Sequence, residues 1–156
     1  MRRTNRRLCL CLVLLLLNLA FIWGNSALPA DASGAFSEWV RSLLSAILPP
    51  AGEPTGGHLI RKLAHFSEFA CLGLLFAWFH GMLGQKISRT AVRALVCGFL
   101  CACVDETIQV FCPGRGPSPV DVMIDTAGVA TGIILLLLGY FICKKKKTTY
   151  ISEEPI

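Results

Sequence analysis

The sequence predicts an all-α membrane protein with four transmembrane helices and one extracytoplasmic amphipathic helix. Hydrophobic residues make up 54% of the 156 residues and charged residues only 16%, whereas a soluble domain carries about 25% charged residues. The mean hydropathy is +0.60. The apolar residues fall in four runs, which approach or exceed the roughly 20 residues of helix that cross a hydrocarbon core.

The first apolar run covers residues 8–23 and follows four N-terminal arginines. A secretory signal peptide has the same outline. The residues that follow, Asn25, Ser26 and Ala27, make a poor cleavage site, because Asn25 stands where a small apolar residue is required. We therefore expect an uncleaved first span.

One helical pattern lies between the first and second apolar runs. Apolar residues recur at positions 0, 3, 4, 7, 8 and 11 from Phe36 to Ile47, and polar residues occupy the other face. This spacing is typical of an amphipathic helix, which Pro49 and Pro50 would end. Because it stands between two spans, we expect it to lie flat in the outer membrane interface.

The remaining apolar runs predict spans over residues 59–83, 91–111 and 120–143. The short link at residues 84–90 makes the second and third spans an antiparallel hairpin, and the link at residues 112–119 is too rich in Pro and Gly to be helical. The expected organisation is an anchor with the interfacial helix over residues 1–57, a three-span core over residues 58–143, and a basic tail over residues 144–156.

The distribution of cations predicts the orientation. Eleven of the fifteen lysines and arginines lie before the first span, around the 84–90 link or after the last span. The positive-inside rule places these three groups, and both termini, on the cytoplasmic side of the membrane. The four remaining cations lie on the outer side: Arg41, Arg61, Lys62 and Arg115. The cations do not form a basic stripe interleaved with exposed aromatic residues, so we do not expect nucleic acid as a partner. The first expected partner is the lipid bilayer.

The eight cysteines do not indicate a disulfide framework or a zinc site. They include no C-x-x-C pair, and all except Cys112 fall inside the apolar runs or at their inner ends. We interpret them as small packing residues.

Polar residues gather within about three helical turns of the outer ends of spans two to four. The ten candidate binding residues are Arg61, Lys62, His65, Glu68, Asp105, Glu106, Gln109, Arg115, Asp121 and Asp125. Helical spacing gives each span one polar face, and a G-x-x-x-G pair at Gly128 and Gly132 permits close helix approach. A charge near the middle of a span costs about 2.5–3.5 kcal/mol. We therefore expect the faces to converge on a hydrated pocket, with the carboxylates paired to Arg61, Lys62 and Arg115.

Four motifs in this region resemble the VanZ-like family, over about residues 58–132. The family pattern runs K-x-x-H-x-x-E, D-E-x-x-Q-x-F, P-G-R and D-x-x-x-N-x-x-G. The matching residues here are Lys62, His65 and Glu68; Asp105, Glu106, Gln109 and Phe111; Pro113, Gly114 and Arg115; and Asp121, Asp125 and Gly128.

The chain departs from the family pattern at one position, because Asp125 stands where the family usually has Asn. A carboxylate accepts hydrogen bonds, whereas an amide both donates and accepts. The site therefore binds an extra cation or proton, or its ligand has changed. The resemblance implies a cell-envelope role in a bacterium, since the family's named member lowers susceptibility to the glycopeptide teicoplanin.

Three functions stay open from the sequence. The first is binding of an amphiphilic envelope ligand or glycopeptide antibiotic at the outer leaflet, with the outer cations holding a phosphate or carboxylate. The second is an enzyme for a lipid-linked substrate, in which His65, Glu68 or Asp105 is catalytic. A divalent cation is a candidate cofactor there, with Glu68, Asp105, Glu106 and Asp121 as candidate ligands. The third is a structural subunit of an envelope complex.

Overall fold

A computed structural model describes residues 2–29, 42 and 56–152, and the regular structure in this part of the chain is helical. The helices are α1 (Arg2–Ser26), α3 (Gly56–Met82), α4 (Ile87–Val110) and α5 (Pro119–Ser152). Each contains a segment long and apolar enough to cross a membrane. The predicted all-α, four-span fold is therefore confirmed. The predicted amphipathic helix at residues 36–47 lies outside the described residues, apart from Ser42.

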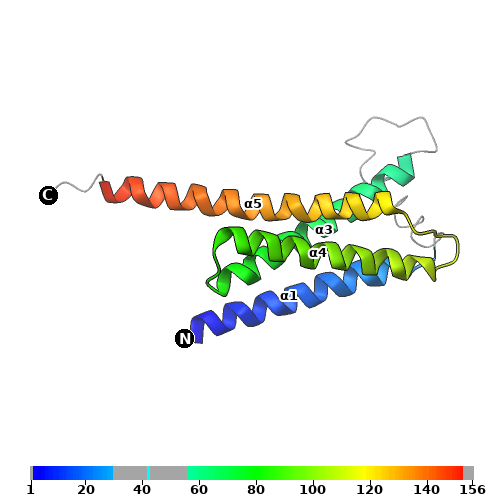
Figure 1. Cartoon of the computed structure of the whole chain (residues 1–156), viewed down its shortest axis with the longest axis horizontal. Helices are drawn as coiled ribbons and strands as arrows, with labels where there is room; N and C mark the ends of the chain where they lie inside the picture. The colour runs from blue at the N-terminus through cyan, green and yellow to red at the C-terminus, as the bar shows by residue number, and fades with distance from the viewer. Residues whose placement is uncertain (1, 30–41, 43–55, 153–156) are drawn as a thin grey trace.

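The four helices run alternately up and down, so that their ends sort into two groups (Figure 1). The start of α1, the α3–α4 turn and the end of α5 lie at one end of the bundle. The start of α3, the end of α1 and the α4–α5 link lie at the other end. The alternation therefore gathers the three cation-rich segments at the same end, as the charge pattern requires.

Glycines bring α3 and α5 into the most extensive helix contact of the bundle. A Cβ atom built on Gly128 would collide with the backbone carbonyl of Phe66, and one on Gly132 with that of Ala70. Gly73 on α3 has the same relation to the backbone of Val129. The small residues let the two backbones touch, as the G-x-x-x-G spacing predicts.

The surfaces of the helices away from these contacts are apolar. Large hydrophobic side chains such as Leu16, Phe99 and Leu135 are more than 40% exposed, which is the surface that lipid would cover. The helix α1 packs on α3 and α4 and buries Cys11, Leu15 and Ile22.

Two connections shape the ends of the bundle. The α3–α4 turn contains Gly84 and the α4–α5 link contains Gly114, and both have positive φ angles, 70° and 76°, which glycine adopts without strain. The helix α5 continues beyond the predicted end of the fourth span at residue 143 and reaches Ser152. Its 34 residues extend about 51 Å at 1.5 Å per residue, more than a hydrocarbon core of about 30 Å.

Candidate functional site

The polar residues of α3, α4 and α5 meet at the end of the bundle opposite the cation-rich segments. They surround a small cavity of about 30 Å³, which has room for a few water molecules or an ion. His65, Glu106, Gln109 and Asp125 on its wall are buried, while Arg61, Lys62 and Asp121 are half-buried and form its opening. The remaining lining residue is Ile124.

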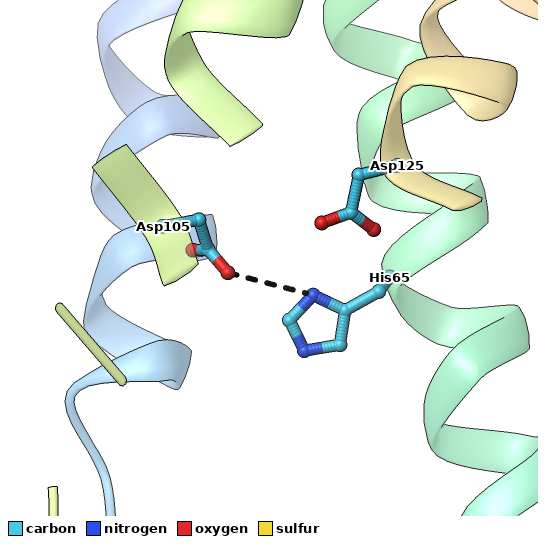
Figure 2. A group of neighbouring side chains, drawn as sticks. All are labelled: His65, Asp105 and Asp125. Atoms are coloured by element: carbon cyan, nitrogen blue, oxygen red, sulfur yellow. Dashed lines mark ion pairs between the residues drawn. The ribbon is translucent and has the colours of Figure 1, made fainter. Parts of the chain in front are cut away.

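Three buried side chains from three helices form a donor cluster within this region: His65 of α3, Asp105 of α4 and Asp125 of α5. One ligand atom from each lies within 4.8 Å of the other two. Figure 2 shows the imidazole and the two carboxylates turned toward the same space. The Nδ1 atom of His65 lies 3.9 Å from Oδ2 of Asp105, which is longer than a hydrogen bond.

Neighbouring groups hold the Asp105 carboxylate in place. Its Oδ2 atom accepts a 2.8 Å hydrogen bond from the hydroxyl of Ser26 and a 2.9 Å bond from the amide of Gln109. Gln109 stands one turn after Asp105 on the same face of α4, as the polar stripe predicts. Ser26 comes from the last turn of α1. The carboxylate is therefore fixed from two directions while its Oδ1 atom has no hydrogen-bond partner.

Other polar atoms of the cluster residues also lack hydrogen bonds. Both ring nitrogens of His65 and the Oδ1 atom of Asp125 are buried and make no hydrogen bond. Leaving a buried polar atom unsatisfied costs about 1–3 kcal/mol. These unsatisfied atoms belong to the three side chains of the donor cluster, and they indicate a place for a further hydrogen-bonding or coordinating group.

One of the three cations expected beside the carboxylates forms a direct ion pair with one of them. Among the lysines and arginines that the structure describes, only Lys62 forms an ion pair with a candidate carboxylate, 2.9 Å from Asp121. Arg61 instead donates to the Gln109 amide oxygen at 3.3 Å. Within the described residues, neither Arg61 nor Arg115 forms a direct ion pair with a carboxylate.

Arg115 supports the end of α1. Its guanidinium donates to the backbone carbonyls of Ser26 and Asn25, at 3.2 and 3.5 Å. Burial lowers the pKa of this guanidinium, and the neighbouring Arg61 adds to the shift, but an arginine remains charged in proteins. The last carbonyls of a helix lack partners within it, although that of Asn25 also accepts from the N–H of Leu28 at 3.2 Å, and a cation there complements the helix dipole. The contact gives Arg115 a structural role.

The candidate metal ligands expected from the sequence separate in space. Of Glu68, Asp105, Glu106 and Asp121, only Asp105 belongs to the donor cluster. Glu106 accepts a 2.8 Å hydrogen bond from the backbone N–H of Ser118 and so fixes the start of α5. Glu68 is half-buried on α3, and its Oε2 atom has no partner.

Two site features were missed by the sequence analysis. Ser26 was considered only as part of a cleavage site, although the alternation of the spans places it at the depth of Asp105. Cys112, the one cysteine outside the apolar runs, is buried, and its Sγ lies 3.3 Å from the carbonyl oxygen of Ser26. All eight cysteines are free, as the sequence predicted.

The fold and the site define a class: a membrane protein with four spanning helices and a buried polar donor cluster near one end of the bundle. A model of the VanZ/LLP1 family matches residues 8–142. The chain belongs to this family, and the match includes the first span as well as the four motifs. No curated protein and no solved structure matches the chain.

Proposed function

We propose that this protein acts in the envelope of a bacterium, where it binds the anionic head of an amphiphilic envelope ligand or lipopeptide-like antibiotic in the outer leaflet. Binding would weaken the action of teicoplanin-type drugs. The observation that carries the proposal is the pair of half-buried cations, Arg61 and Lys62, at the opening of the polar cavity.

The size of the cavity favours contact at its opening. A space of about 30 Å³ is too small for a headgroup, since ligand pockets measure about 300–1,000 Å³. Arg61 uses one N–H group on Gln109, and its planar guanidinium can hold a phosphate or carboxylate by two parallel bonds. Lys62 pairs with Asp121, and both side chains are about 30% exposed. An incoming anion can therefore replace Asp121 beside Lys62.

An apolar groove suits the other half of an amphiphile. It lies between α1 and α3, has a volume of about 440 Å³, and is lined by Leu14, Leu17, Phe21 and Leu75 among others. Of the groove residues on α3, Cys71 is the nearest to the start of the helix, and it lies about one turn after Glu68. An acyl chain in this groove would keep a polar head near the level of the cavity.

Drug susceptibility tests the proposal directly. The chain is expressed in a teicoplanin-susceptible Gram-positive host, and inhibitory concentrations are measured for teicoplanin and for a deacylated derivative. We expect at least a fourfold rise for teicoplanin and a smaller one for the derivative. Arg61→Gln and Lys62→Gln should each reduce the rise, whereas Arg89→Gln, an exposed cation at the opposite end of the bundle, should not. Equal susceptibility with and without the chain would refute the proposal.

Binding measurements separate the other two functions. Purified protein in lipid nanodiscs is titrated with teicoplanin. His65→Ala or Glu68→Gln proteins that bind normally but fail to protect would favour an enzyme acting on a lipid-linked substrate. Protection by a protein that binds no teicoplanin would favour a structural subunit of an envelope complex.

A further inference from the structure

We propose that His65, Asp105 and Asp125 bind one divalent transition-metal ion at the outer end of the bundle. The three residues come from three different helices, and their donor atoms lie within 4.8 Å of one another. Metal binding at these residues does not depend on the amphiphile binding proposed above, because the site would form in the purified protein without any other ligand.

The positions of the donors suit one ion. Metal–nitrogen and metal–oxygen bonds of about 2.1 Å place neighbouring donors of a tetrahedral ion about 3.4 Å apart, and opposite donors of an octahedral ion about 4.2 Å apart. The 3.9 Å separation of His65 Nδ1 and Asp105 Oδ2 lies between these values. Small side-chain rotations would bring all three donors to bonding distance, and Figure 2 shows that they already point toward a common centre.

The unpartnered atoms point to a ligand rather than to an acidic cluster alone. His65 is 6% exposed and Asp125 only 1%, and both ring nitrogens and Oδ1 of Asp125 lack hydrogen bonds. Within the described part of the chain, no lysine or arginine forms an ion pair with Asp105 or Asp125. A cation would therefore satisfy one ring nitrogen of His65 and an oxygen of Asp125, and it would balance two buried carboxylates.

Neighbouring groups complete the arrangement that metal sites have. Ser26 and Gln109 donate to Oδ2 of Asp105 and orient this carboxylate, as hydrogen bonds to metal ligands commonly do. His65 and Asp125 also line the small cavity, which has room for water as a further ligand. One imidazole with two carboxylates suits Mn²⁺, Fe²⁺ or Zn²⁺ better than Ca²⁺ or Mg²⁺, which prefer oxygen donors alone.

The test uses full-length purified protein and Mn²⁺ alone. Mn²⁺ is the better probe because the eight free cysteines would take up zinc. After treatment with a chelator, we expect one Mn²⁺ per chain, counted by loss of the free-ion electron paramagnetic resonance signal. Asp125→Asn and His65→Ala should weaken binding at least tenfold. The matched control His80→Ala, a histidine at the other end of α3, should bind within threefold of the unaltered protein.

A second measurement uses the unaltered protein, so that it tests the site even if the Asp125 or His65 variants fail to fold. Electron spin echo spectroscopy of Mn²⁺ on the unaltered protein should show imidazole nitrogen coupling, and His80→Ala, at the other end of α3, should keep it. No stoichiometric binding, no nitrogen coupling, or an equal loss of Mn²⁺ binding in His80→Ala would each overturn the site.

Discussion

The hydroxyl of Ser26 at the end of α1 donates a 2.8 Å hydrogen bond to Oδ2 of Asp105 in α4, 79 residues further along the chain. Both side chains are fully buried. Arg115 binds the carbonyl of the same serine from the α4–α5 link. Two contacts therefore join the first span to the polar site, and one of them helps to orient the Asp105 carboxylate.

Replacing Ser26 should weaken both the fold and the site. Ser26→Ala removes one of the two donors to the buried Asp105 carboxylate, so we expect a loss of about 1–3 kcal/mol in unfolding free energy. Thermal unfolding in detergent measures this loss. Ser67→Ala is the matched control, because the exposed Ser67 hydroxyl bonds only to the Ala64 carbonyl of its own helix. Equal stability of the two variants would show that the α1–α4 bond contributes nothing.

The contact between α3 and α5 predicts different effects for two glycines of one helix. In Gly132→Ala the new methyl group would collide with the backbone of Ala70 and force the helices apart, costing at least about 2 kcal/mol. In Gly139→Ala the methyl group would meet no atom within 4 Å, and alanine favours a helix by about 1 kcal/mol. Unfolding temperatures in detergent should therefore fall in the first variant alone. A stable Gly132→Ala protein would contradict the close packing.

Arg115→Lys distinguishes a structural from a ligand-binding arginine. Lysine keeps the charge but loses the fork that reaches two carbonyls at the end of α1. We expect a loss of about 1–2 kcal/mol in unfolding free energy, measured as a lower unfolding temperature. Any loss of drug protection should be no larger than this loss of stability explains. Arg89→Lys, on an exposed side chain, should have no effect. Unchanged stability together with lost ligand binding would instead show that Arg115 binds the ligand.

The orientation can be tested with introduced cysteines. Buried Cys112 is a poor reporter, so we choose Gly116→Cys in the α4–α5 link and Ser88→Cys at the start of α4, both at exposed positions. A membrane-impermeant thiol reagent should label Gly116→Cys on intact cells and Ser88→Cys only after permeabilisation, because cation-rich ends face the cytoplasm. Mass spectrometry of the labelled peptides separates them from the natural cysteines. The reverse pattern would place the polar site at the inner surface.

Sequence spacing was most informative where a property repeats along a helix. Apolar length predicts the four spans, and the four-residue interval between Asp105 and Gln109 predicts that their side chains meet. The G-x-x-x-G pair predicts the close packing of α5, although not that its partner is α3. These properties depend on local geometry, which every helix of this composition shares.

Contacts between helices depend on rotation and tilt, which spacing within one helix does not define. The tertiary structure alone decides that Asp125 and His65, rather than Glu106 and Asp121, share a donor cluster with Asp105. It also decides that Arg115 binds the end of α1 instead of a carboxylate. Charge pattern could suggest only that opposite charges lie at one membrane depth. Which of them meet is determined by the glycine contacts that bring α3 against α5 and by the packing of α1 beside α4.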